Sequence, residues 1–153
     1  MVDEKTQKTN KSYSLGIGRR REAVARVRIY NPTSGKVEVF GEERKRGDII
    51  VNGKLVSEYF NFVSFGPQYK NILEKTDVSG KYIISIRVVG GGLNGQMDAV
   101  VHGIARALDK MDPEKHHKIL SDAGYLTRDP RTRERRKVGN AGKARRKKSS
   151  PKR

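Results

Sequence analysis

The sequence predicts an α/β fold of the α+β type: a single two-layer sandwich of about four strands with helices on one face, plus a long extended C-terminal arm. Strands are indicated where apolar residues alternate with arginines over 23–30 and where β-branched residues gather over 81–89. Apolar residues at helical spacing over 97–111 indicate an amphipathic helix. Residues 127–153 hold almost no apolar side chains, so they have no face to bury against a core.

The charge distribution divides the chain into three expected segments. Residues 1–12 form a polar leader that we expect to be disordered, 13–126 a globular α/β RNA-binding domain, and 127–153 an extended basic arm. The arm carries 13 Lys and Arg against two acids, which gives +11 of the chain's formal charge of +17. A segment of this kind takes shape only against dense negative charge, and a polyphosphate backbone supplies it. An anionic membrane is disfavoured because no amphipathic helix with exposed aromatics flanks the arm.

The first strand is predicted at 23–30, with its odd-numbered residues buried and Arg26 and Arg28 on a cationic face. Before it stands the stretch 16–21, GIGRRR. Its glycines allow close approach to a partner, and its arginines suit phosphate or ribose, although a solvated loop at the strand edge is the alternative. After a turn cluster, residues 36–40 alternate again and are expected to complete a hairpin with the first strand.

The middle of the chain is predicted to be irregular. The charged residues 41–47 indicate a loop or a hairpin tip, and 48–51 a short strand that turns at Asn52-Gly53. Ser57 is the expected cap of a short helical piece, and Gly66-Pro67 is expected to break that piece.

The most apolar strand is predicted at 81–89 (KYIISIRVV), in the centre of the sheet. It leads through a glycine-rich loop into the helix over 97–111. Asp112-Pro113 should end that helix and start another, with Ile119 and Leu120 on its inner side.

The glycine-rich loop, Gly90-x-Gly92-x-x-Gly95, has the spacing of a dinucleotide-binding fingerprint. We reject that interpretation because no strand bearing a ribose-binding acid follows the helix. Two alternatives stay open: backbone N–H groups at the helix start could bind a nucleic-acid phosphate, or the glycines could serve a tight turn at positive φ.

Catalytic and metal chemistry have little support in this sequence. His102, Arg106 and Lys110 are spaced to form a basic helix face, which would contact phosphate or be solvated. The adjacent His116 and His117 have no third ligand, and the chain has no cysteine, so no metal is expected. We find no nucleophile–base pair, phosphate-loop lysine or paired acids in an apolar context, so we expect no enzyme and no cofactor.

Four segments, in order, resemble a known family: GIGRRREAVARVRIY at 16–30, NGKLVSEYF at 52–60, GGGLNGQMDAVVHGIARAL at 90–108 and GYLTRDPRTRERRKVGNAGKARR at 124–146. They are similar to the universal ninth protein of the small ribosomal subunit, from about Leu15 to the end. The resemblance implies a sandwich with a left-handed crossover, placed in the subunit head on small-subunit rRNA. It also implies that Lys152 and Arg153 reach the anticodon stem-loop of the peptidyl-site tRNA.

Two features depart from the family pattern. The stretch 40–50 looks like an insertion after the second strand. The C-terminal end lacks the aromatic residue that the family usually has there, so only the charge contact is carried over.

The sequence therefore predicts a structural constituent of the small ribosomal subunit, located in the cytoplasm, with an organellar ribosome as the alternative. The expected partners are small-subunit rRNA, peptidyl-site tRNA and other proteins of the subunit head, with no membrane and no small-molecule substrate. The rivals are a free-standing DNA- or chromatin-binding protein and a nucleotide-dependent enzyme that uses the glycine loop. The tRNA-binding candidates are Lys152 and Arg153. The rRNA-binding candidates are Arg19, Arg20, Arg21, Arg26, Arg28, Gly91, Gly92, Gly95, His102, Arg106, Arg128, Arg131, Arg133, Arg135, Arg136, Lys137, Lys143, Arg145, Arg146, Lys147 and Lys148.

Overall fold

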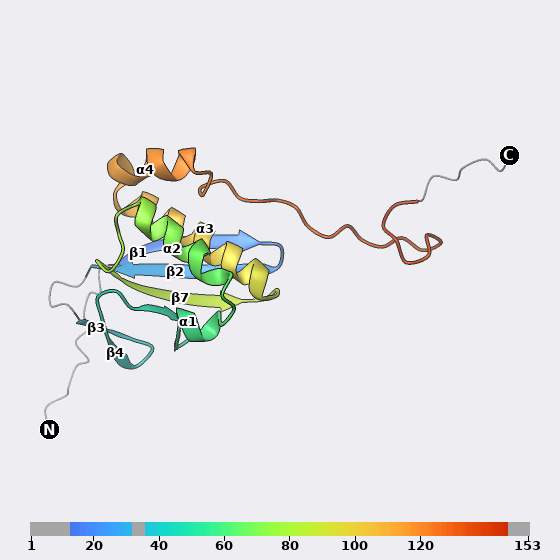
Figure 1. Ribbon diagram of the computed structural model, residues 1–153. Coiled ribbons are helices and arrows are strands. Elements are labelled where there is room, and N and C mark those ends of the chain that lie inside the picture. Colours follow the sequence, from blue (N-terminus) through green and yellow to red (C-terminus); the bar gives the residue numbers. More distant parts are fainter. Residues whose placement is uncertain (1–12, 32–35, 147–153) are drawn as a thin grey trace, which may run out of the picture.

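A five-stranded mixed sheet forms the centre of the protein in the computed structural model, which describes residues 13–31 and 36–146 (Figure 1). The predicted leader, most of the turn at 31–35 and residues 147–153 lie outside the described residues. The strand order is β1-β2-β7-β5-β6, and only the β5–β7 pair is parallel. The strands of this sheet are β1 (Tyr13–Arg20), β2 (Ala23–Tyr30), β5 (Ile49–Val51), β6 (Lys54–Leu55) and β7 (Ile83–Val89).

The larger helices lie on one face of this sheet, as the sequence predicts (Figure 1). The helices are α1 (Val56–Tyr59), α2 (Phe65–Lys75), α3 (Leu93–Met111) and α4 (Pro113–Asp122). Alternate residues of β2 from Ala23 to Ile29 are buried against them, and the apolar stripe of α3 faces the sheet. The two parallel strands, β5 and β7, are joined through α1 and α2. No described helix is both long and apolar enough to cross a membrane.

Glycines let α3 lie unusually close to β1. A Cβ built on Gly16 would be 2.2 Å from the carbonyl oxygen of Gly103, and one built on Gly18 would be 1.9 Å from that of Ala99. Residues 16–20 belong to the strand β1, whereas the sequence predicts a loop there, before the strand at 23–30. The partner that these glycines approach closely is a helix of the same chain.

A second, two-stranded sheet corrects the predicted hairpin. β3 (Lys36–Val39) pairs with β4 (Glu42–Lys45) and not with β2, whose free edge is occupied by β7. Phe40 and Gly41 both have positive φ, which suits a tight two-residue turn. Val39 packs with residues of the main sheet, on the face away from the helices. The stretch 40–50 thus completes a hairpin that covers one end of that face.

Several local helix signals were misread in the sequence. Ser57 caps nothing, because Leu55 precedes the first turn of α1 and no side-chain cap is present. Gly66-Pro67 lies inside the first turn of α2, where proline is tolerated because its missing N–H would have no partner there. Leu120 of α4 is fully buried, whereas Ile119 is 42% exposed. The start of α4 at Pro113 and the central place of β7 are confirmed.

Candidate nucleic-acid interface

An arginine face forms on the side of the sheet away from the helices. We use this name for Arg19, Arg26, Arg28 and Arg87. The antiparallel register sets Arg26 directly opposite Arg87, so their side chains leave the same face. None of the strand residues that β1, β2 and β7 place on this face is acidic. Like charges directly opposite each other are destabilising, and a bound polyanion would relieve that repulsion.

Apolar and aromatic groups lie among these arginines. The guanidinium of Arg28 is 5.0 Å from the centre of the Tyr13 ring, which packs against Tyr30. Leu15 and Val89 are exposed on the same face, at 38% and 56%. The surface therefore offers both charge and stacking area, a combination suited to RNA.

Sequence reasoning missed Arg87. The run KYIISIRVV predicts a central, strongly apolar strand, and the cation in its middle is the signal that one of its sides is open. Arg87 is exposed.

The three consecutive arginines at 19–21 point to three different environments. Arg19 belongs to the arginine face, while Arg21 lies in the turn after β1, at φ 51°, beside the glycine-rich loop. The side chain of Arg20 is only 11% exposed and bonds within the protein. Its Nη2 lies 3.0 Å from Asp129 Oδ2, and its Nη1 donates to the carbonyl of Arg131 at 2.7 Å.

The outer side of α3 packs over the edge of β1. Arg106 Nη1 donates to the carbonyl of Ile17 at 2.8 Å, and the Arg19 N–H donates to His102 Nδ1 at 3.4 Å. Burial lowers the pKa of His102, and the nearby charge of Arg106 lowers it further. His102 is therefore a neutral acceptor at neutral pH, while Arg106 is exposed and keeps donors for a ligand.

The histidines of α4 do not form a metal site. His116 is buried, and Nδ1 of His117 lies 2.7 Å from Asp109 Oδ1. Across the part of the chain that the structure describes, no three His, Asp or Glu side chains are placed to hold a metal ion.

The glycine-rich loop makes a tight turn. Gly90 and Gly91 have φ of +74° and +64°, and a Cβ on Gly90 would be 2.5 Å from the carbonyl oxygen of Glu22. Gly92 has no such requirement, because a Cβ there would meet nothing within 4 Å. The positive-φ alternative thus accounts for Gly90 and Gly91, and Gly91, Gly92 and Gly95 line a groove.

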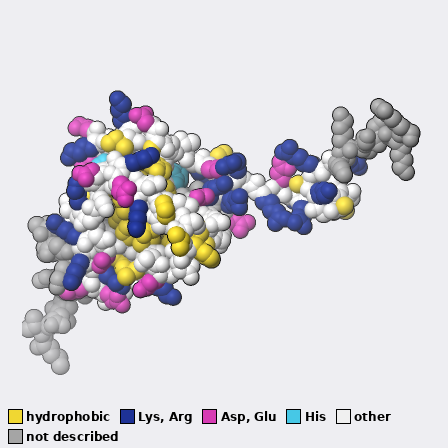
Figure 2. All heavy atoms as spheres, in the orientation of Figure 1, with side chains coloured by type: hydrophobic (Ala, Val, Ile, Leu, Met, Phe, Trp, Pro, Cys, Tyr) yellow, Lys and Arg dark blue, Asp and Glu magenta, His cyan; other side chains and the backbone are white. Residues whose placement is uncertain are grey.

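The described part of the arm, residues 127–146, contains no helix or strand and leads away from the body (Figures 1 and 2). Both of its acids are paired inside the protein: Asp129 with Arg131 and Arg20, and Glu134 with Arg145. Hydrogen bonds from Arg131 lower the pKa of Asp129, and hydrogen bonds from Arg145 lower the pKa of Glu134. The remaining cations are exposed, with no carboxylate in ion-pair contact among the described residues: Arg128, Arg133, Arg135, Arg136, Lys137, Lys143 and Arg146.

The arm is extended only up to about residue 136. It then closes a small loop, in which the Lys137 N–H donates to the Lys143 carbonyl at 3.2 Å and the Lys143 N–H to the Asn140 carbonyl at 3.0 Å. Gly139, Ala141 and Gly142 all have positive φ. The ion pair of Glu134 and Arg145 lies across the base of this loop. Lys147, Lys148, Lys152 and Arg153 lie beyond the described residues.

Comparison with known proteins points the same way as the geometry. The family model described as "Ribosomal protein S9/S16" matches residues 18–153. A protein of Dehalococcoides mccartyi (strain 195) named "Small ribosomal subunit protein uS9" is 43% identical over 128 residues, 84% of this chain and 86% of the relative. The protein of the same name from Synechocystis is 42% identical over 132 residues, 86% of each chain.

Proposed function

Because the chain belongs to the ribosomal protein S9/S16 family, we propose that it is a structural, non-catalytic constituent of the small ribosomal subunit that binds small-subunit rRNA. The ribosome then sets its location, in the cytoplasm or in an organelle, and its neighbours are rRNA and other proteins of the subunit. The body and the arm would each contribute a separate cationic surface.

The observation that carries this proposal is the state of the arm's charges. The two acids, Asp129 and Glu134, are already neutralised by Arg131 and Arg145, while most of the arm's cations are exposed. An exposed polycation without apolar residues gains free energy chiefly by displacing counterions from a phosphate backbone. Contacts of this type position the protein without reading base sequence, so RNA shape would provide the specificity.

The arginine face supports a second contact on the body. Arg26, Arg28 and Arg87 project from rigid strands, so their spacing is fixed before binding. A pre-organised cationic surface loses little conformational entropy on association. We infer that this face docks on one rRNA segment while the arm follows another.

The rRNA contact is tested by the salt dependence of binding between the full chain and small-subunit rRNA. If about six arm cations pair with phosphates, log K against log [salt] should fall with a slope near −5, and deletion of residues 128–153 should remove most of that slope. A slope near zero for the full chain would contradict the proposal. A free-standing DNA-binding protein would instead prefer duplex DNA and would not sediment with small subunits in moderate salt.

We further propose that Lys152 and Arg153 contact peptidyl-site tRNA. This finer role rests on the family resemblance, and the residues that the family model matches include 152 and 153. The 27 residues of the arm could span up to about 90 Å if fully extended, at ~3.3 Å per residue. Deleting 151–153 should leave assembly intact and weaken peptidyl-site tRNA binding, measured by filter binding to reconstituted subunits. Unchanged tRNA affinity would overturn the tRNA contact while leaving the rRNA role standing.

A further inference from the structure

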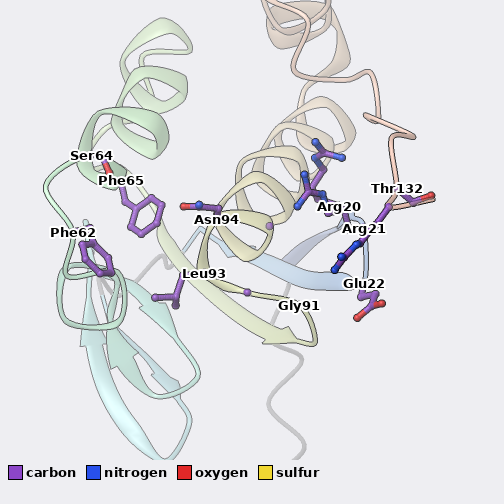
Figure 3. A pocket seen from close by; sticks show the side chains of 13 residues that line it. Arg20, Arg21, Glu22, Phe62, Ser64, Phe65, Gly91, Leu93, Asn94 and Thr132 are labelled. Atoms are coloured by element: carbon purple, nitrogen blue, oxygen red, sulfur yellow. The ribbon is translucent and has the colours of Figure 1, made fainter. Parts of the chain in front are cut away.

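A groove of about 840 Å³ lies between the glycine-rich loop and the segment that enters α2. Its volume is within the ~300–1,000 Å³ typical of small-ligand sites. Figure 3 shows Phe62, Phe65 and Leu93 on one side, Arg20 and Arg21 on the other, and Asn94 between them. The groove is therefore apolar along one wall and cationic along the other.

The apolar wall ends in an aromatic ring that is held from one side only. Phe62 is 59% exposed, and its ring packs edge to face on Phe65 at 5.8 Å. Phe65 is buried and packs in turn on Phe60 at 5.6 Å. The core thus fixes Phe62 while leaving much of its ring open to solvent, which is the arrangement of a stacking platform for a base.

The cationic wall combines two distant parts of the chain. Arg21 comes from the turn after β1, and Arg133 comes from the arm. Both are exposed, and a guanidinium binds phosphate through paired hydrogen bonds. One acid, Glu22, also lines the groove, and Figure 3 shows it beyond Arg21 with its side chain turned away from the aromatic rings.

Hydrogen bonds hold the two ends of the glycine-rich loop in place behind the groove. Gln96 Nε2 donates to the carbonyl of Gly90 at 3.1 Å, and the Tyr59 hydroxyl donates to Gln96 Oε1 at 2.9 Å. The side chain of Asn52 bonds both the N–H and the carbonyl of Val88, each at 3.0 Å. The strand before the loop and the helix after it are therefore both fixed, so the glycine-rich side of the groove is held in place before any ligand binds.

We propose that this groove binds one unpaired RNA nucleotide. The base stacks on Phe62 with the amide of Asn94 at its edge, and the phosphate lies at Arg21 and Arg133. The inference rests on the proposed rRNA-binding function and adds a defined subsite to it. A peptide without acidic residues could use the apolar wall but would gain nothing from the two exposed arginines, whereas a nucleotide has both a flat base and a phosphate.

Substitutions at position 62 distinguish stacking of a base on an aromatic ring from simple apolar contact. The probe is a fluorescein-labelled hexauridylate, and its affinity for the full chain is measured by fluorescence anisotropy. Phe62→Leu keeps an apolar side chain but removes the ring, and should weaken binding roughly five- to 100-fold, whereas Phe62→Tyr should stay within about twofold of the native chain. The neighbouring Val63 is 94% exposed and does not line the groove, so Val63→Ala is the matched control and should change nothing.

The salt dependence of hexauridylate binding distinguishes the contribution of the cationic wall from that of the apolar wall. Arg133→Gln should reduce the log–log salt slope by about 1, while Phe62→Leu should lower affinity without changing the slope. Thermal unfolding of each variant establishes that the fold is kept.

Two results would overturn the nucleotide site. Equal affinities of the native chain and Phe62→Leu for the hexauridylate would show that no base stacks on Phe62. The proposed function would still stand if the native chain binds small-subunit rRNA. Loss of affinity in Phe62→Tyr as large as in Phe62→Leu would show that no aromatic ring is recognised. By contrast, failure of the native chain to bind small-subunit rRNA would defeat the proposed function and the subsite with it.

Discussion

Arg20 Nη2 lies 3.0 Å from Asp129 Oδ2, and this ion pair joins the end of β1 to the start of the arm. The same guanidinium donates to the carbonyl of Arg131, and its Nε lies 3.4 Å from Asp98 of α3. Arg20 is thus largely satisfied within the protein. It orients the first residues of the arm relative to the sheet and α3.

Replacing Arg20 by Ala should loosen the start of the arm while the body stays folded. Hydrogen exchange of peptides covering 125–132 should become faster, because the bond to the Arg131 carbonyl and the pair with Asp129 are both lost. Arg131→Ala is the control: its side chain is 82% exposed, and its ion pair is with Asp129 of the arm itself. Equal exchange in the native chain and Arg20→Ala would show that this arginine does not hold the arm.

The ion pairing of Asp129, which attaches the arm, should not depend on pH in the physiological range. The pKa of Asp129 is held well below its usual range, first by hydrogen bonds from Arg131 and to a smaller extent by Arg20. A depressed carboxyl pKa contributes stability above the unfolded value, near 3.9, that is lost only as pH falls toward the folded value. In the His102→Asn variant, which removes the titrating histidine beside this segment, exchange at 128–132, corrected for intrinsic rates, should therefore be flat from about pH 5 to 8. A rise in exchange within that window would contradict the assignment.

His102 should make stability fall in mild acid. Its pKa is lowered by burial and then by Arg106, so the folded state favours the neutral ring that accepts the Arg19 N–H. The stability that the neutral ring contributes is fully present above the unfolded-state pKa of histidine, about 6.5. It is lost as pH falls through the lower pKa that His102 has in the folded state.

His102→Asn offers an acceptor that does not titrate at this pH. The urea midpoint of the native chain should therefore drop more between pH 7.5 and 5 than that of the variant. Parallel curves would rule out this histidine as the source of the pH dependence.

Alanine at Gly16 or Gly18 should destabilise the whole body. The added Cβ would overlap backbone atoms of α3, which cannot rotate away as a side chain can. Overpacking of this kind costs about 1–3 kcal/mol in the free energy of unfolding, measured by urea denaturation. Gly66→Ala is the matched control, because nothing lies within 4 Å of the added atom. Native stability in Gly18→Ala would mean that α3 is not fixed against β1.

Arg87→Gln should stabilise the free protein and weaken RNA binding. Removing one of two facing cations relieves a repulsion, worth roughly 0.2–1 kcal/mol for cross-strand pairs. The same change should reduce the log–log salt slope of rRNA binding by about 1. Lys118→Gln, on α4, makes the same charge change away from the arginine face and should leave the slope unaltered. A lower stability in Arg87→Gln would contradict the opposed effects that we expect.

Sequence periodicity was enough to predict the strands and the helix whose buried residues recur at regular spacing. β2, β7 and α3 follow directly from their apolar patterns, and the resemblance supplied the family. Strand partners could not be read in the same way. Residues 36–39 alternate as a strand should, but the pattern does not reveal that β7 already occupies the edge of β2. Partner choice depends on contacts distant in sequence, which local pattern does not contain.

In the candidate site, too, local features could be predicted from the sequence and contacts between distant residues could not. The cationic character of the arm is visible in composition alone, whereas the role of Arg20 depends on Asp98 and Asp129, which are remote in the chain. The groove was also invisible to sequence reasoning, because nothing in the local sequence shows that Phe65 holds the ring of Phe62 edge to face.

The closed loop at 137–143 has a consequence for how far the C-terminal end can travel. Its seven residues begin and end at a single backbone bond, from Lys137 to Lys143, so they add almost nothing to the span of the arm. Pulled straight they would add roughly 23 Å at ~3.3 Å per residue. The arm can therefore lengthen if this loop opens. The ion pair between Glu134 and Arg145, which lies across the base of the loop, must break before it does so.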